Sequence, residues 1–283
     1  MQVLLPRSLR EALDAAADHP RADFLAGGTD LMVEINFGRK RPETIIYIQR
    51  LAELQELDQD GAIRAGAGVT YTRLLEADAP GMTAMREMAR TVGSPQIRNA
   101  GTLGGNLGTS SPAGDALPVL AAYDAEVLLR SRQGERRLSL TAFMTAPKRN
   151  ARRPDEIILG TLWRDPGSAQ TFMKVGTRNA MVIAVASLCL VIDRARRTVR
   201  VALGSCGPTI IRATEAERFA EGVADEAGWE RPLAANDAAL FRFGELVAAA
   251  ARPIDDVRGT AAYRRHVLGV MARRALARVG AIV

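Results

Sequence analysis

The 283-residue sequence has very few residues of the types that bind transition metals: two cysteines and two histidines. A [2Fe–2S] cluster is usually held by four cysteine thiolates, and a structural zinc ion by four cysteine or histidine side chains. The chain has too few ligands for either site, and we expect no metal ion in it. His19 lies beside Pro20 and His266 follows a basic segment, contexts typical of exposed side chains rather than catalytic ones. Redox chemistry in this chain would therefore depend on an organic cofactor.

Long apolar runs and a secretory leader are also missing. The longest apolar run, residues 181–192, is much shorter than the roughly 20 residues of a membrane-spanning helix, and it predicts a buried strand instead. Residues 1–13 do not contain a basic region followed by an apolar stretch, as a signal peptide would. We therefore expect a cytoplasmic protein with no integral membrane segment.

A net charge of +6 is the feature that would favour nucleic-acid binding. However, the basic residues are scattered in short groups, and aromatic residues make up only 5% of the chain. Proteins that bind single strands combine a basic groove with aromatic rings on which the bases stack, and no such interleaved stripe is present. We expect no nucleic-acid partner and interpret the arginine-rich surface as a docking surface for acidic partner subunits.

The composition predicts a packed globular protein, because 47% of the residues are hydrophobic and 25% are charged. The length allows two domains, and the composition changes at the turn Asp165-Pro-Gly. We expect a first domain at residues 1–166, with lobes at about 1–58 and 59–166, and a second domain at 167–283. Helices are predicted near the end of the chain at 234–251 and 263–278.

Two glycine clusters in the first domain are candidates for binding phosphate: Ala26-Gly-Gly-Thr-Asp30 and Gly101-Thr-Leu-Gly-Gly-Asn106. Glycine has no Cβ, so its backbone N–H groups approach phosphate oxygens closely and adopt the positive φ of an anion-binding nest. The first cluster follows a predicted strand at 24–26, and ligands tend to bind at the carboxyl ends of strands. Neither cluster has Walker or Rossmann spacing. One Gly-Gly-Thr favours an ordinary tight turn, but two clusters are consistent with a pyrophosphate held from both sides.

Residues 94–111, around the second cluster, predict a long loop rich in Gly, Ser, Thr and Asn, and such loops are usually functional. Two charged residues that come after it each have two interpretations. Asp115 is expected either to cap the next helix or to accept a hydrogen bond from a sugar hydroxyl of a ligand. Lys174, in a predicted strand at 171–175, either faces outward by the alternation of the strand or presents its charge to a cofactor.

Five motifs together resemble the FAD-binding subunit of the xanthine dehydrogenase and carbon monoxide dehydrogenase family. They lie, in chain order, at residues 26–30, 96–106, 111–115, 174–178 and 258–265. The resemblance covers nearly the whole chain, and the stretch from 96 to 115 is its most specific part. It implies an α+β fold: a two-lobed FAD-binding domain of the vanillyl-alcohol-oxidase (PCMH) type, followed by a smaller C-terminal α+β domain.

The resemblance also implies which residues bind the FAD cofactor. They are Phe24, Leu25, Ala26, Gly27, Gly28, Thr29, Asp30, Leu31, Thr102, Leu103, Gly104, Gly105, Asn106, Thr109, Asp115, Ile158 and Lys174. In the family, the segments at 24–31 and 102–106 would wrap the FAD pyrophosphate from opposite sides.

The remaining matched residues would contact other parts of the cofactor. Asp115 and Thr109 would face the ribityl-phosphate region, and the backbone of Ile158 would meet the cofactor. Lys174 would lie near the isoalloxazine ring, which reverses the outward-facing interpretation that its strand favours. Some family members have an aromatic residue before the second glycine cluster, packed by the flavin ring, where this chain has Val92 and Gly93.

The family architecture implies that other subunits hold the metals. A large subunit would carry the molybdenum cofactor and oxidise the substrate, and a small subunit would carry two [2Fe–2S] clusters, in a dimer of heterotrimers. Electrons would then pass to FAD on this chain and leave to NAD, a quinone, a carrier protein or oxygen. Two other functions remain open: a self-contained FAD-dependent oxidase, and a redox-silent nucleotide-binding scaffold.

Overall fold

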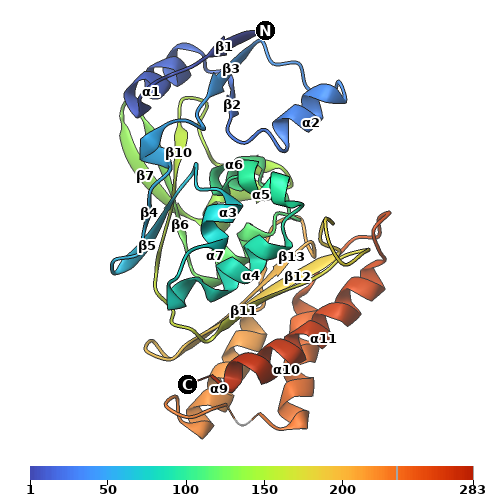
Figure 1. Ribbon diagram of the computed structural model, residues 1–283. Coiled ribbons are helices and arrows are strands. Elements are labelled where there is room, and N and C mark those ends of the chain that lie inside the picture. Colours follow the sequence, from blue (N-terminus) through green and yellow to red (C-terminus); the bar gives the residue numbers. More distant parts are fainter. Residues whose placement is uncertain (234, 283) are drawn as a thin grey trace.

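A computed structural model describes residues 1–233 and 235–282 of the chain. The molecule is elongated, with the N-terminal strands at one end and the last three helices at the other (Figure 1). Its three larger sheets follow one another along this length, and a two-stranded hairpin forms a fourth sheet. Within the described residues, no helix is both long enough and apolar enough to cross a membrane.

The first lobe is a small parallel sheet with strand order β1-β3-β2. Its elements are β1 (Gln2–Leu4), α1 (Leu9–Asp18), β2 (Asp23–Leu25), α2 (Leu31–Asn36) and β3 (Thr44–Tyr47). Helix α1 begins where the Ser8 side chain accepts a hydrogen bond from the N–H of Glu11, which satisfies one free donor of the first turn. The first glycine cluster follows β2 directly, so it lies at the carboxyl end of a strand as predicted.

The second lobe is built on an antiparallel sheet with strand order β4-β5-β10-β6-β7. Its strands are β4 (Leu57–Asp58), β5 (Ala62–Gly66), β6 (Glu126–Ser131), β7 (Gly134–Ser139) and β10 (Ile157–Arg164). Two short strands, β8 (Met144–Ala146) and β9 (Arg149–Asn150), form a separate hairpin, and a 3-10 turn η1 (Ala52–Leu54) precedes β4. The sheet begins at Leu57, so it includes the two residues before the expected lobe boundary at 58/59.

Helices between β5 and β7 pack beside this sheet. They are α3 (Tyr71–Leu75), η2 (Pro80–Met82), α4 (Thr83–Thr91), α5 (Pro95–Ala100), α6 (Leu103–Thr109) and α7 (Ala116–Ala122), with α8 (Leu140–Phe143) after β7. The prediction of a long loop at 94–111 is wrong, because α5 and α6 occupy most of it. Glycine disfavours helix by about 1 kcal/mol per residue. Here Ser94 and Thr102 cap the two helices, and Leu103 and Leu107 of α6 are completely buried, which outweighs that cost.

The C-terminal part contains a four-stranded antiparallel sheet and three helices. The elements are β11 (Gln170–Val175), β12 (Ala186–Asp193), β13 (Thr198–Gly204), β14 (Ile211–Arg212), α9 (Thr214–Ala227), α10 (Asp237–Ala250) and α11 (Ala261–Gly280). The strand predicted at 181–192 starts later than expected, at Ala186. The helices predicted at 234–251 and 263–278 correspond to α10 and α11, although residue 234 itself lies outside the described residues.

Helices cover both faces of this C-terminal sheet. Helices α4 and α7 lie against one face, and α9 and α11 against the other (Figure 1). Alternate residues of β12 therefore enter two different cores: Cys189 and Val191 join the first, and Leu188 and Leu190 the second. The prediction that Cys189 is a packed core thiol is confirmed, since it is completely buried.

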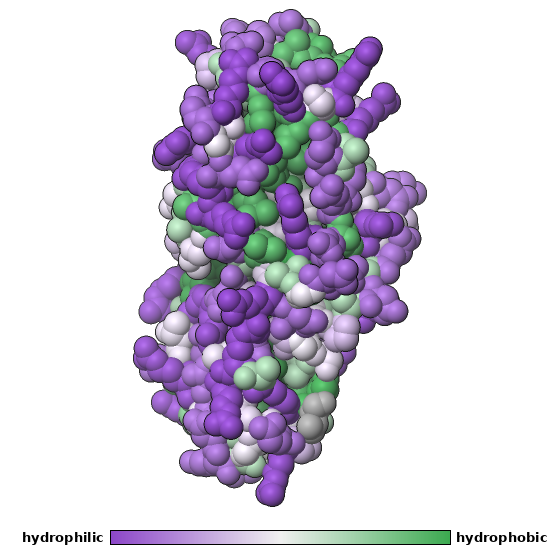
Figure 2. Space-filling view, turned by 90° about the vertical axis from the view of Figure 1, so that its left-hand side faces the viewer, coloured by the Kyte–Doolittle hydropathy of each residue, from purple (hydrophilic) through white to green (hydrophobic). Residues whose placement is uncertain are grey.

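Seen from the side, the surface is not uniform along the length of the molecule. Figure 2 shows apolar side chains gathered among hydrophilic ones over the upper part, which the two N-terminal lobes form. Around the three C-terminal helices the same face is more hydrophilic. The apolar surface of this view therefore lies mainly on the part that carries the glycine clusters.

A partly buried ion pair joins β7 to the loop that leads into β10. Arg136 of β7 donates two hydrogen bonds to the carboxylate of Glu156, at 2.5 and 2.7 Å, and the N–H of Arg153 donates a third at 2.6 Å. Burial raises the pKa of Glu156, but these hydrogen bonds lower it by more, so the net pKa is below its ordinary value. A carboxylate with a lowered pKa stabilises the fold above its unfolded pKa and loses that contribution as pH falls.

We predict that Glu156→Gln lowers the free energy of unfolding at pH 7 by about 1–3 kcal/mol, because the hydrogen bonds from Arg136 and Arg153 lose their buried, charged acceptor. Urea unfolding at pH 7 and at pH 3 measures this, and the difference from wild type should shrink at pH 3. Glu135→Gln is the control, because its pair with Arg130 is exposed and is expected to be worth less than about 1 kcal/mol. A deficit that is as large at pH 3 as at pH 7 would contradict the assigned role.

Candidate functional site

The fold places the two glycine clusters in direct contact. A Cβ on Gly27 would lie 1.6 Å from the carbonyl oxygen of Ala100, at the junction of α5 and α6. This position has no room for any side chain, so only glycine allows the first turn to rest on the second cluster. Farther along, the hydroxyl of Thr109 donates to the carboxylate of Asp30 at 2.9 Å. Residues 24–31 and 102–109, far apart in the sequence, therefore form one continuous surface.

The two clusters differ in the backbone donors that they leave free. Among the described residues, the N–H groups of 27–30 have no hydrogen-bond acceptor, and Gly28 has φ of +72°. In the second cluster the donors are already used: Leu103, Gly104 and Gly105 donate to Val69 O at 3.0 Å, Ala67 O at 2.8 Å and Thr102 Oγ1 at 2.9 Å. Backbone groups that bind a phosphate must be free to donate. The first turn is therefore the part of this surface that can bind an anion through its backbone.

Among the described residues, two buried side-chain oxygens near the two ends of this segment have no hydrogen-bond partner: Oδ1 of Asn106 in α6 and Oδ1 of Asp115 before α7. A Cβ on Gly114 would come within 3.0 Å of the Asn106 oxygen, so the loop before α7 packs tightly on α6. A buried acceptor without a donor costs about 1–3 kcal/mol. Ribityl and ribose hydroxyls are donors that would satisfy these atoms, so the residues present fit FAD.

Asp115 does not act as a helix cap. It occupies the position before α7, but its side chain makes no capping hydrogen bond and instead accepts from Lys174 Nζ at 2.6 Å. The two side chains are 10% and 5% exposed. Of the two interpretations of Lys174, the outward-facing one does not hold, because helices pack on both faces of its sheet and the side chain is buried. Lys174 also donates to the carbonyl of Thr91 at 3.3 Å, next to Val92.

The charge of Asp115 also affects Tyr71, a residue that no sequence motif indicated. Burial raises the pKa of Asp115, and the positive charge of Lys174 partly offsets this. Burial, together with the charge of Asp115, raises the pKa of Tyr71, so its phenol stays protonated. The Tyr71 ring lies against Gly101, where a Cβ would be 3.2 Å from two ring carbons. A buried tyrosine directly after the cap Thr70 gave no separate signal in the sequence.

Arg152 is a second residue that the sequence did not reveal. Its guanidinium carbon lies 4.9 Å from the centre of the Phe24 ring, a cation–π contact, and Nη1 donates to the carbonyl of Glu156 at 2.8 Å. Burial lowers the pKa of Arg152. Ile158 is nearly buried under α6, where a Cβ on Gly108 would be 3.9 Å from its Cδ1. Helix α6 thus contacts the first glycine turn through Asp30 and β10 through Ile158, while Lys174 reaches the site through its pair with Asp115.

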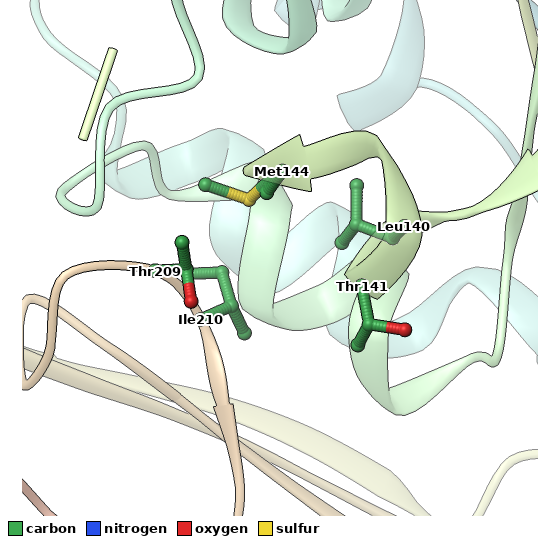
Figure 3. A pocket seen from close by; sticks show the side chains of 5 residues that line it. All are labelled: Leu140, Thr141, Met144, Thr209 and Ile210. Carbon is green, nitrogen blue, oxygen red and sulfur yellow. The ribbon is translucent and has the colours of Figure 1, made fainter. Parts of the chain in front are cut away.

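Two cavities lie away from this surface. Figure 3 shows the smaller, of about 50 Å³, between α8 and the segment before β14, lined by Leu140, Thr141, Met144, Thr209 and Ile210. It has no charged side chain and is a gap in the packing of the two domains. The larger, of about 540 Å³, lies along the seam between β10 and β12, and neither cavity includes a predicted FAD-binding residue. Within the described part of the chain, no three His, Cys, Asp or Glu side chains are grouped as metal ligands would be.

The sequence matches two known domain families that together cover most of the chain. Residues 1–161 match the family described as the FAD binding domain in molybdopterin dehydrogenase, and residues 171–279 the CO dehydrogenase flavoprotein C-terminal domain. The chain is 30% identical over 281 residues to the xanthine dehydrogenase FAD-binding subunit of Escherichia coli O157:H7, covering 95% of this chain and 92% of that protein. It is 39% identical over 191 residues to the nicotinate dehydrogenase FAD-subunit of Eubacterium barkeri, where the match spans 64% of each chain.

Solved structures show the same fold at lower identity. The CO dehydrogenase of Oligotropha carboxidovorans matches with a TM-score of 0.89 and 24% identity, over 100% of this chain and 98% of that one. Quinoline 2-oxidoreductase of Pseudomonas putida 86 matches with a TM-score of 0.87 and 21% identity, over 99% and 96%.

The fold and the matched domains define an FAD-binding flavoprotein with an α+β fold, as the sequence motifs predicted. More particularly, the chain belongs to the family of FAD-binding subunits of molybdopterin dehydrogenases.

Gly104 and Gly105 have different surroundings, so substitutions at the two positions should affect folding and cofactor binding differently. A Cβ on Gly104 would lie 2.5 Å from the Cβ of Ala67, whereas one on Gly105 would meet only Thr102 Oγ1, at 3.1 Å. We predict that Gly104→Leu destabilises the flavin-free protein by about 1–3 kcal/mol through overpacking. Gly105→Leu should leave the melting temperature nearly unchanged and lower FAD affinity at least about tenfold, equivalent to about 1.4 kcal/mol.

Thermal melts of the flavin-free variants and titration with FAD, followed by flavin fluorescence, distinguish these effects. Normal FAD affinity in Gly105→Leu would show that the cofactor does not pass over the first turn of α6.

Proposed function

We propose that this chain is the electron-transfer flavoprotein subunit of a heteromeric molybdenum hydroxylase. It receives electrons from the [2Fe–2S] clusters of a small partner subunit and passes them to an external acceptor. A large partner subunit holds the molybdenum cofactor and the substrate, so this chain does not contact the molecule that is hydroxylated. The observation that carries the proposal is the convergence of the first glycine turn, α6 and the Asp115–Lys174 pair on one surface.

Bound FAD supplies the capacity to take up and release electrons, and this chain's residues hold it. The free N–H groups of 27–30 bind negative phosphate charge, and Gly28 allows the turn to present them. The unpartnered oxygens of Asn106 and Asp115 orient sugar and ribityl hydroxyls. Lys174 provides positive charge that stabilises negative charge on the reduced cofactor, and burial strengthens that effect because little water screens it.

The remaining predicted contacts belong to the same proposal. Residues 24–26 and Leu31 flank the pyrophosphate turn, Thr29 adds a hydroxyl donor, and the segment 102–106 with Thr109 covers the cofactor from the side of α6. The backbone of Ile158 supports it from β10. The domain boundary is proposed at 166/167, before β11, and the complex is proposed to be a cytoplasmic dimer of heterotrimers.

The self-contained oxidase is less well supported by this site. Such enzymes often tether their flavin through a cysteine or histidine. Cys189 and Cys206 are completely buried, and burial raises the pKa of each thiol, so neither is available as a nucleophile. His19 lies at the C-terminal end of helix α1, outside both the glycine turn and α6. No observation favours the redox-silent scaffold.

Purification of the chain from its native source with its bound partners tests the proposal. We expect a flavin absorbance spectrum, FAD released on denaturation, and co-purified subunits that contain iron–sulfur clusters and molybdenum. Substrate added to the complex should bleach the flavin, because electrons reach it through the partner. A lone chain that oxidises a small molecule without partners would contradict the proposal and support the oxidase.

A further inference from the structure

The motif at 258–265 contains an arginine that is almost completely buried and lies outside the proposed cofactor surface. Arg264, in the first turn of α11, is 2% exposed. Its Nη1 donates to the carbonyl oxygens of Val185 and Ser205, both at 2.8 Å, and its Nη2 donates to the carboxylate of Asp256 at 2.6 Å. These contacts fix the start of α11 beside the ends of β12 and β13 (Figure 1).

Each of the two carbonyl contacts leads to one half of the buried ion pair. The N–H of Val185 donates to the carbonyl of Val175 at 2.8 Å, and Val175 is the neighbour of Lys174. The N–H of Ser205 donates to the carbonyl of Pro112 at 2.8 Å, in the loop that leads to Asp115. One guanidinium nitrogen thus holds both the strand that carries the ammonium and the loop that carries the carboxylate.

The backbone conformation of Ser205 indicates that its two hydrogen bonds restrain this segment. Ser205 has φ of +58°, a left-handed conformation that is unfavourable for a non-glycine residue. Its carbonyl is held by Arg264 and its N–H by Pro112, so the unfavourable conformation is fixed from both sides. The fork of a guanidinium reaches two carbonyls and a carboxylate together, which a lysine ammonium on a flexible stem does not reproduce.

We propose that Arg264 is a positioning residue for the flavin: it sets the separation and orientation of Asp115 and Lys174 by holding Val185 and Ser205. The proposal rests on the proposed function, because the pair is taken to face the cofactor. Arg264 itself touches neither side chain of the pair. The alternative is that Arg264 only anchors α11 and affects stability alone.

The test compares the conservative variant Arg264→Lys with a matched control, Arg265→Lys, at the exposed neighbouring position on the same helix. FAD affinity, the reduction potential of bound FAD and the melting temperature are measured for both, and for Lys174→Met as a reference. We expect Arg264→Lys to weaken FAD binding about tenfold and to lower the potential in the same direction as Lys174→Met. Arg265→Lys should change affinity less than about twofold.

A double variant separates positioning from stability. If Arg264 acts through Lys174, Arg264→Lys combined with Lys174→Met should lower the potential no further than Lys174→Met alone. A lower melting temperature with an unchanged potential, or additive shifts of potential, would overturn the proposal. Should Arg264→Lys fail to fold, Asp256→Asn keeps both carbonyl contacts, weakens the hold on the guanidinium, and should give a smaller shift in the same direction.

A measurement without FAD distinguishes failure of this proposal from failure of the proposed function. If the wild-type chain binds no FAD, the proposed function fails, yet the carboxyl carbon of Asp115 can still be titrated by NMR in the flavin-free protein. Lys174 lowers the pKa of Asp115, so loosening the pair in Arg264→Lys should raise that pKa further. The same pKa in wild type, Arg264→Lys and Arg265→Lys would refute the positioning role.

Discussion

The carboxylate of Asp115 and the ammonium of Lys174, 2.6 Å apart and almost out of contact with water, join the two domains at the proposed cofactor surface. Asp115 comes from the start of α7 in the first domain, and Lys174 from β11 in the second. A buried ion pair is weak evidence for stability, because the loss of hydration of both charges offsets most of their attraction. Its value here is electrostatic: it places one positive and one negative charge in a weakly screened environment, and one oxygen of the Asp115 carboxylate still lacks a donor.

The position of this pair follows from the way the second domain packs. Because α4 and α7 cover one face of the four-stranded sheet, a residue of β11 that would face solvent in a half-exposed sheet faces the first domain instead. Lys174 thereby reaches the carbonyl of Thr91 as well as Asp115. The second domain contributes one side chain, Lys174, to the proposed site. Arg264 of α11 restrains the backbone near it through hydrogen bonds to Val185 and Ser205.

Several elements and residues of the proposed site were predictable from the sequence, where the local pattern of residues determines the local structure. The turn at Gly27 and Gly28 was predictable from two glycines after a strand, and the structure shows that Gly27 is needed for close contact and Gly28 for a positive φ. The short helices α5 and α6 were not predictable, since their polar and glycine-rich composition resembles a loop and buried Leu103 and Leu107 stabilise them. The direction in which Lys174 points could not be predicted from the alternation of its strand, because alternation does not show whether another element packs on each face of the sheet. Tyr71 and Arg152 became visible only when distant segments were brought together.

The first glycine turn supplies the free backbone donors for FAD in the proposed site, whereas the first N–H groups of α6 are already hydrogen-bonded within the protein. Amide hydrogen exchange of the wild-type chain, with and without FAD, tests it most directly. We expect strong additional protection of the amides at 27–30 on binding, and little change at 103–105, whose N–H groups already have acceptors within the protein. No added protection at 27–30, or protection confined to the seam between β10 and β12, would contradict it.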